Sequence, residues 1–270
     1  MKPGNMIVTL STDSNYVKHA THLLRSIAVN SPHTKVHCRA IDCSSEELQQ
    51  LKDAHHNIIL DDEQLGLSSK RQYFRAGTVL STDITQRGPH GSHLLSYRQC
   101  YVSNTRYRNI LHCLETLGED SVILLDADAI VRKNLCELQA FIDSYDVCCN
   151  VGTDADRYPN RRCWECSCII VKNTKNAIDF FNHVKRCAES SMTDWDSDQF
   201  AIENVYAHNK DSISLCEKIH HIEDLSWRDV TLHNWETLQY EYSPDSYIWP
   251  GSGEAKFTST YLKERDKYGI

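Results

Sequence analysis

The sequence predicts an α/β fold built on a mostly parallel, open sheet flanked by helices. Short apolar runs of strand length alternate along the chain with longer stretches of helical periodicity. Strands that are joined through crossover helices run parallel to one another. The chain has 270 residues, of which 40% are hydrophobic and 24% are charged, an ordinary globular composition. It contains no internal repeat and no low-complexity linker, so we expect one compact unit.

The first third of the chain predicts a strand–helix–strand–helix–strand order, with strands at residues 7–10, 36–41 and 57–60. An apolar stripe between the first two strands predicts a helix that Ser14 or Asn15 caps. Ser44 and Glu47 have the spacing of a capping box, and they predict a second helix that ends near residue 54. Residues 67–93 are polar and rich in glycine, so we expect a long irregular segment there.

The same alternation continues to about residue 215. A helix is predicted from about residue 98 to residue 117, and a buried strand follows at residues 122–125. Further strands are expected at residues 147–151 and 168–171, and further helices near residues 135–142, 177–184 and from 198 onward. Beyond residue 215 we expect short strands and loops.

Bulk properties argue against nucleic-acid and membrane partners. The formal net charge is −8 at pH 7, whereas a surface for nucleic acid or anionic lipid needs positive charge. No apolar run approaches the length of a membrane span, and no apolar signal segment precedes the first predicted strand. We therefore expect a cytoplasmic protein without a transmembrane segment.

Twelve cysteines is a high count for this length. The densest group is Cys163, Cys166 and Cys168, and no second pair with the spacing of a structural zinc site follows it. Without a secretion signal, reduced thiols are expected. The sequence thus favours buried thiols over a zinc site in this segment.

Two aspartates give the strongest indication of function. Asp126 and Asp128 directly follow the apolar run 122–125. A buried strand that ends in two carboxylates must end at a wet edge, because unpaired buried charge is costly. Side chains at i and i+2 of an extended chain point the same way, so the two carboxylates are expected to converge. Two oxygen ligands on one face suit Mg²⁺ or Mn²⁺, and such ions usually also hold phosphate oxygens.

Four segments occur along the chain in a characteristic order. They are the opening stretch 7–16, the helix that contains Arg106, the strand that ends in Asp126-Ala127-Asp128, and the later pair Asp198-Gln199. This order resembles that of the GT-A glycosyltransferases, most nearly the family 8 type, and the resemblance extends from about residue 6 to residue 262. The Asp-x-Asp strand and the Asp-Gln pair are its more specific parts.

The resemblance implies a GT-A fold with a nucleotide-sugar-binding part at about residues 1–130 and an acceptor-binding part at about residues 131–270. It implies that Asp126 and Asp128 hold Mn²⁺ or Mg²⁺, which bridges the two phosphates of a nucleoside-diphosphate sugar. Such an ion neutralises the charge that grows on the leaving nucleoside diphosphate. The implied reaction moves a hexosyl or pentosyl group from a donor, UDP-sugar above all, to a hydroxyl of a sugar or glycan acceptor.

The resemblance also implies the other donor contacts: Thr9, Ser11, Thr12, Asp13 and Tyr16 near the base and ribose, Arg106 and Ala127 near the phosphates or donor sugar, and Asp198 and Gln199 facing that sugar. Asp198 would act as a base toward the acceptor hydroxyl or would orient donor hydroxyls. Simpler interpretations stay open: a core tyrosine for Tyr16, a solvated helix arginine for Arg106 with Arg108 as its neighbour, and an ordinary helix N-terminus for Asp198.

The C-terminal part departs from the family pattern. Family 8 enzymes carry His-x-x-Gly-x-x-Lys, in which the histidine is a metal ligand and the glycine and lysine meet the diphosphate. Here Gly253 and Lys256 keep that spacing, but Pro250 stands in the histidine position and cannot bind a metal. The third protein ligand is then missing, supplied from elsewhere or replaced by water. His233 is the nearest substitute by position, ahead of His220 and His221, and Mg²⁺ keeps several waters readily.

Two other functions remain compatible with these residues. A phosphatase of the haloacid dehalogenase type also places Asp-x-Asp after an apolar strand, with Asp126 as nucleophile and Asp128 as general acid. That class expects the motif early in the chain and a later acidic motif, neither of which is found. The other possibility is a nucleotide-sugar-binding protein without turnover, which the Pro250 departure favours and the retention of Lys256 disfavours.

Overall fold

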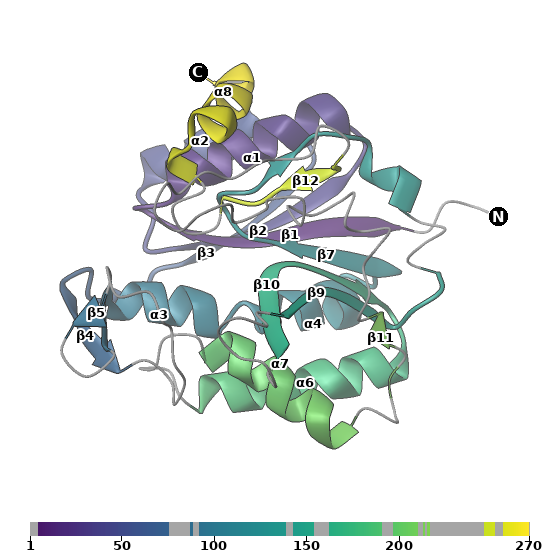
Figure 1. Cartoon of the computed structure of the whole chain (residues 1–270). Helices are drawn as coiled ribbons and strands as arrows, with labels where there is room; N and C mark the ends of the chain where they lie inside the picture. Colours follow the sequence, from purple (N-terminus) through teal and green to yellow (C-terminus); the bar gives the residue numbers. More distant parts are fainter. Residues whose placement is uncertain are drawn as a thin grey trace.

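A seven-stranded sheet forms the centre of the molecule in the computed structural model (Figure 1). The structure describes residues 5–75, 87–88, 92–138, 143–153, 162–190, 197–209, 213, 215–216, 246–251 and 256–269. The strands of the central sheet are β1 Met6–Asp13, β2 Lys35–Ile41, β3 Ile58–Glu63, β7 Ser121–Leu125, β9 Val147–Thr153, β10 Arg162–Lys172 and β11 Leu215–Cys216. Their order in space is β11-β9-β10-β7-β1-β2-β3.

The sheet is mostly parallel, which confirms the predicted class. Strands β3, β2, β1 and β7 pair parallel to one another, and β11 pairs parallel to β9. Strand β10 is antiparallel to both β7 and β9, so only this strand of the seven described runs against the rest. The carboxyl ends of β1, β2, β3 and β7 therefore lie at one edge, where ligands of open α/β sheets bind.

Helices cover both faces of the sheet (Figure 1). They are α1 Val17–Asn30, α2 Ser45–Ala54, α3 Tyr97–Asn104, α4 Tyr107–Leu111, the π-helical turn η2 His112–Thr116, the 3-10 turns η3 Leu135–Leu138 and η6 Asp266–Tyr268, α6 Lys175–Glu189, α7 Ser197–Asn209 and α8 Ser259–Arg265. Val8 and Leu10 of β1 pack in one core with α1, whereas Ile7 packs in a second core with α4 and α6. This alternation follows from the two-residue period of a strand. No helix in the described part of the chain is long and apolar enough to cross a membrane.

Two smaller sheets lie outside the central one. Strands β4 Arg71–Arg75, β5 Arg87–Gly88 and β6 Ser92–Ser96 form a three-stranded antiparallel sheet. The prediction of an irregular segment at residues 67–93 was thus wrong for these strands, because pairing between segments about twenty residues apart leaves no local apolar pattern. Strands β8 Ile130–Val131 and β12 Ile248–Trp249 form the other sheet, which fastens the C-terminal segment beside the end of β7.

Helix boundaries differ from the prediction at three places. The single helix predicted at residues 98–117 is interrupted after Asn104, where the Thr105 hydroxyl donates to the Tyr101 carbonyl (2.7 Å). Tyr16 is the N-cap residue of α1 and contributes no side-chain cap, so neither Ser14 nor Asn15 has the predicted role. Helix α8 lies in the tail where only strands and loops were predicted. The capping box of Ser44 and Glu47 is confirmed.

Candidate functional site

Asp126 and Asp128 lie in the turn that follows β7. The strand is buried over its whole length, and the chain turns at Ala127 and Asp128 before it enters β8. The Ala129 amide closes this turn on the Asp126 carbonyl (3.0 Å). The aspartates therefore approach each other through a turn, rather than through the extended geometry that the sequence predicts. Burial raises the pKa of Asp126, and the neighbouring Asp128 charge also acts to raise it.

Arg106 joins Asp126 to Asp198. Its Nη1 donates to Asp126 Oδ1 (2.8 Å), and its Nε lies 3.3 Å from Asp198 Oδ2. The same Nη1 donates to the carbonyl of Cys166 on β10 (3.0 Å). The interruption between α3 and α4 lets Arg106 take this place, as the N-cap residue of α4. Its side chain is 15% exposed, so it is not a solvated helix arginine.

Burial controls the protonation of these acids. It raises the pKa of Asp198 as well as that of Asp126, and the Arg106 charge opposes both shifts. A carboxylate with a raised pKa loses its charge at a higher pH than an exposed one. Asp198 also receives the Gln199 amide at its Oδ1 (2.9 Å), and the Tyr107 hydroxyl donates to its carbonyl (2.8 Å). These contacts hold the first turn of α7 against α4.

The C-terminal segment supplies the cation for Asp128. Lys256 Nζ donates to Asp128 Oδ2 (2.7 Å), and it lies 3.3 Å from the Tyr16 hydroxyl and 5.0 Å from the centroid of the Tyr16 ring. Burial alone would lower the pKa of Lys256, but the Asp128 carboxylate reverses the shift and raises it. Lys256, Asp128 and Tyr16, which are far apart in sequence, thus form one charged cluster.

Two residues that sequence reasoning missed position Asp128. A Cβ on Gly251 would lie 2.5 Å from the Asp128 carbonyl oxygen and 2.9 Å from its Cβ and Cγ, so only glycine permits this close approach. The Tyr261 hydroxyl donates to the same carbonyl. The glycine was visible in the sequence beside Pro250, but no local pattern links either residue to Asp128.

The donor set of the aspartate turn fits a hard divalent cation. One oxygen of Asp126 accepts from Arg106 and one oxygen of Asp128 accepts from Lys256. The second oxygen of each carboxylate has no hydrogen-bond partner within the described part of the chain. Two carboxylate oxygens, with water and phosphate oxygens, are an ordinary Mg²⁺ or Mn²⁺ environment.

The end of β1 lies beside this cluster, and its polar side chains are already engaged. Asp13 Oδ1 accepts the amides of Asn15 (3.1 Å) and Tyr16 (3.2 Å), and burial raises the pKa of Asp13. Ser11 Oγ accepts from Asn109 (2.9 Å). Thr12 is fully buried, and so is Thr9, whose hydroxyl contacts His37 (2.8 Å) rather than the aspartate turn.

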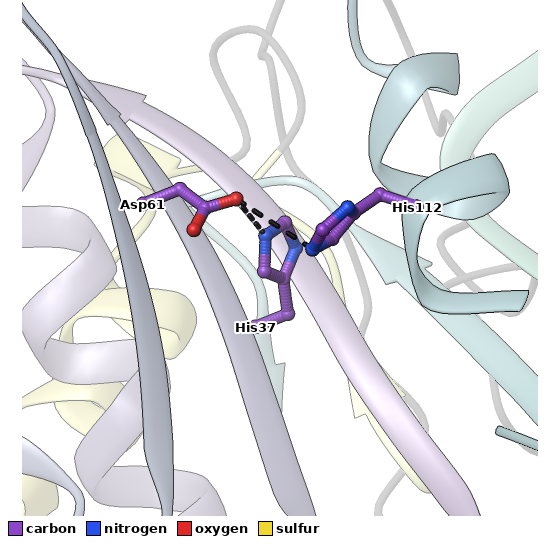
Figure 2. Close-up of side chains that lie close together, drawn as sticks. All are labelled: His37, Asp61 and His112. Carbon is purple, nitrogen blue, oxygen red and sulfur yellow. Dashed lines mark hydrogen bonds and ion pairs between the residues drawn. The ribbon is translucent and has the colours of Figure 1, made fainter. Parts of the chain in front are cut away.

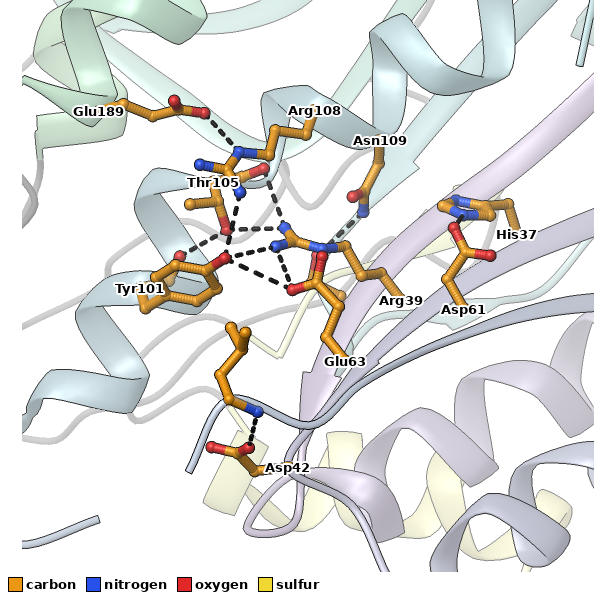
Figure 3. A network of polar contacts seen from close by, with 12 residues as sticks. His37, Arg39, Asp42, Asp61, Glu63, Tyr101, Thr105, Arg108, Asn109 and Glu189 are labelled. Carbon is orange, nitrogen blue, oxygen red and sulfur yellow. Dashed lines mark hydrogen bonds and ion pairs between the residues drawn. The ribbon is translucent and has the colours of Figure 1, made fainter. Parts of the chain in front are cut away.

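Arg108 does not face the aspartate turn. Its Nε pairs with Glu189 of α6 (2.7 Å), and its Nη1 donates to the Tyr101 hydroxyl (3.1 Å). Figure 3 shows that this contact continues into an ion pair of Arg39 with Glu63 (2.6 Å). The network ties α3, α4 and α6 to the ends of β2 and β3, which gives Arg108 a structural role.

The two remaining candidates, His233 and Gly253, lie outside the described residues, so the third metal ligand stays a prediction. Pro250 is buried directly after β12 and next to Gly251. Among the described cysteines none belongs to a metal-ligand group, and Cys166 and Cys168 are buried thiols, as predicted.

A family model described as nucleotide-diphospho-sugar transferase matches residues 98–243, which is more than half of the chain. That range contains Arg106, Asp126, Asp128 and Asp198. No curated protein sequence matches the chain.

Solved glycosyltransferases share the fold. The bifunctional glycosyltransferase WbbM has a TM-score of 0.58 at 12% identity over 98% of this chain and 49% of its own. GlyE of Streptococcus pneumoniae TIGR4 has a TM-score of 0.53 at 13% identity over 97% of this chain and 60% of its own. The galactosyltransferase LgtC, solved with donor and acceptor sugar analogs, has a TM-score of 0.53 at 13% identity over 98% and 96%. The chain thus spans about half to 60% of the first two. At these identities the likeness shows the fold alone, which is the GT-A fold that the resemblance implies.

The contact between Gly251 and Asp128 predicts a local defect in Gly251→Ala. The added methyl must displace Asp128 or the chain beside it, and we expect a loss of about 1–3 kcal/mol in the free energy of unfolding, as for an overpacked core. Urea unfolding measures this loss, and titration with Mn²⁺ should show at least tenfold weaker binding. Gly118→Ala is the control, because its positive φ of 68° strains the backbone but nothing lies within 4 Å of the new methyl. Equal Mn²⁺ binding by both variants would contradict a role of this contact in positioning Asp128.

Arg106 predicts a shift in pH dependence. In Arg106→Met the opposing charge is gone, so the pKa values of Asp126 and Asp198 should rise further. A divalent ion such as Mn²⁺ would bind the ionised carboxylates, so the acid limb of Mn²⁺ affinity should move to higher pH, as measured by titration between pH 4 and pH 8. Arg108→Met is the matched control, since Arg108 pairs with Glu189 instead. An unchanged acid limb in Arg106→Met would refute this role.

Proposed function

The chain belongs to the nucleotide-diphospho-sugar transferase family. We therefore propose that it transfers a sugar from a nucleoside-diphosphate sugar to a hydroxyl of a sugar or glycan acceptor, with a UDP-sugar as the first donor to test. The observation that carries this proposal is the aspartate turn after β7, with Lys256 and Tyr16 on one side and Arg106 and Asp198 on the other. A dication and a diphosphate have complementary partners there. The donor that the product analysis below identifies will show whether the transferred sugar is a hexose or a pentose.

Asp126 and Asp128 would hold Mn²⁺ or Mg²⁺, which when bound supplies Lewis-acid stabilisation of the leaving diphosphate. The chain's own contribution is positioning. The turn at Ala127 sets the direction of both carboxylates, and Gly251 and Tyr261 fix the backbone of Asp128. A site held by such contacts keeps its geometry without reorganisation during reaction.

Lys256 would pass from Asp128 to the donor. Its ammonium pairs with Asp128 Oδ2 at 2.7 Å. The oxygens of a bound diphosphate would offer the ammonium a second anionic partner. Transfer of Lys256 to phosphate would leave that carboxylate oxygen to the metal. Binding of the dication and binding of the donor would then favour each other. Gly253, three residues before Lys256, would allow the backbone to approach the diphosphate.

Asp198 and Gln199 would face the donor sugar. Asp198 is buried and keeps a cation partner in Arg106, which supports an ionised carboxylate at neutral pH despite its raised pKa. An ionised carboxylate can accept the proton of the acceptor hydroxyl or bind hydroxyls of the donor sugar. Tyr16, at the end of β1 beside Lys256, would lie against the base, with Ser11, Thr12 and Asp13 shaping that end of the site.

Product analysis with Mn²⁺ and a panel of nucleotide-sugars tests the function. Release of a nucleoside diphosphate together with a glycosylated acceptor supports the proposal. Release of inorganic phosphate from a simple phosphate ester would instead support the haloacid dehalogenase type. Binding of donor without either product would identify a protein that has lost turnover.

Asp126→Asn and Asp128→Asn should each abolish metal-dependent transfer. Each variant removes one anionic metal ligand, and we expect a loss in kcat of at least about 100-fold with the far-UV circular dichroism spectrum unchanged. Nucleoside diphosphate release in the presence of Mn²⁺ measures the effect. Asp179→Asn is the control, because Asp179 is an exposed residue of α6 that pairs with Lys175. Normal turnover in both Asp126→Asn and Asp128→Asn would contradict the proposed function.

Lys256→Met should separate metal binding from donor binding. Without the competing ammonium, Mn²⁺ alone should bind Asp128 more tightly, whereas the KM for the nucleotide-sugar should rise about tenfold, because one charged hydrogen bond to phosphate is lost. Calorimetry with Mn²⁺ and steady-state kinetics report the two effects independently. Lys18→Met on the exposed face of α1 serves as the control. Weaker binding of both Mn²⁺ and donor would argue against exchange of Lys256 between the two partners.

A further inference from the structure

Two histidines and one aspartate from three different elements form a cluster (Figure 2). His37 lies on β2, Asp61 on the edge strand β3, and His112 is the first residue of the π-helical turn η2. Strands β1 and β2 lie between β7 and β3 in the sheet. Neighbouring strands are about 4.8 Å apart, so Asp61 lies about 14 Å from β7 across the sheet. One ligand atom of each residue lies within 4.8 Å of the others.

We propose that His37, Asp61 and His112 bind a divalent transition-metal ion of the zinc class, with one coordination position left to water or an exchangeable ligand. Two imidazoles and one carboxylate suit zinc and its neighbours, whereas Mg²⁺ and Mn²⁺ prefer oxygen ligands such as those of Asp126 and Asp128. The two sites therefore differ in the metal they select. This inference does not depend on the proposed transfer reaction.

The distances are close to those of a tetrahedral site. His37 Nε2 lies 2.9 Å and His112 Nε2 3.8 Å from the same atom, Asp61 Oδ2. With zinc bonds of about 2.0–2.1 Å, adjacent ligand atoms of a tetrahedron are about 3.3 Å apart. A movement of the Asp61 side chain by roughly 0.6–1 Å, away from His37 and toward His112, would meet both distances. Asp61 has room for it, because its side chain is 45% exposed.

The surroundings of His37 fit a metal ligand. Its side chain is 1% exposed, and its Nδ1 lies 2.8 Å from the Thr9 hydroxyl, which can donate or accept a hydrogen bond. Metal-binding histidines usually donate their second ring N–H to an oxygen, which fixes the ring and its tautomer. When Nδ1–H donates to the Thr9 hydroxyl, Nε2 carries the lone pair and faces Asp61 Oδ2.

Neighbouring charges leave the cluster open to a cation. Arg39, the next residue of β2 on this face, is balanced by Glu63 at 2.6 Å (Figure 3). His112 is 33% exposed, so an ion can reach the cluster from solvent past His112 and Asp61.

A metal at this position would link three elements. Strand β3 is the edge of the central sheet and pairs only with β2 among the described strands, while η2 packs from the helical layer. Coordination would join β2, β3 and η2 by bonds that the unfolded chain cannot form together. Zinc should therefore raise the melting temperature of the folded protein.

Calorimetric titration of the full chain with Zn²⁺, in excess Mg²⁺, tests the site. We expect one binding step in the wild-type protein, with a matching rise in melting temperature. His112→Ala and Asp61→Asn should weaken this step at least tenfold; both residues are partly exposed, so both variants should fold. Two controls should retain it: His33→Ala, which removes an exposed histidine, and Asp126→Asn, which removes the oxygen-ligand site.

The proposal is overturned if the wild-type protein shows no Zn²⁺ step, which would leave the cluster a hydrogen-bonded His–Asp pair. It is equally overturned if His112→Ala and Asp61→Asn bind Zn²⁺ as tightly as His33→Ala. Loss of the step in Asp126→Asn but not in His112→Ala would assign the ion to the aspartate turn instead. Sugar transfer by the zinc-site variants reports separately on the proposed function.

Discussion

Buried negative charge at the carboxyl end of β7 is the constraint on which the arrangement of the site depends. Asp128 and Asp198 are buried and Asp126 is only partly exposed, so each carboxylate requires a cation or hydrogen-bond donors. The chain supplies Arg106 from the break between α3 and α4 and Lys256 from the C-terminal segment. Removing one partner from a buried pair costs about 3–5 kcal/mol. The helix break and the docked tail thus supply the two cations that neutralise these acids.

The same constraint explains why distant segments meet at one residue. Asp128 contacts Lys256, Tyr261 and Gly251, and Lys256 also reaches Tyr16 at the start of α1. The pairing of β12 with β8 brings the tail to this place before any side chain is considered. A dication with a diphosphate would enter a site in which each anion already has a cation. Exchange of partners, rather than uncompensated burial of charge, would then accompany binding.

The central sheet could be predicted because each of its strands carries a local apolar pattern. The run before Asp126 is buried on both faces of the sheet, and the expected strand became β7. The interruption at Thr105 could not be predicted, since the apolar period continues across it and only the contacts of Arg106 show why the helix breaks there. The sheet of β4, β5 and β6 was missed for a related reason: its pairing is not encoded in any one segment.

For the site, residue chemistry was visible in the sequence and residue contacts were not. Two aspartates behind an apolar strand predict a cation site, and this prediction does not depend on whether an extended chain or the observed turn carries them. Gly251 is indistinguishable from any loop glycine until the approach of Asp128 is known. The cluster of His37, Asp61 and His112 is the same case, because the three residues share no motif and meet only through the strand register and the π-helical turn. A metal site assembled from three separate elements has no sequence spacing to recognise, so only the fold can reveal it.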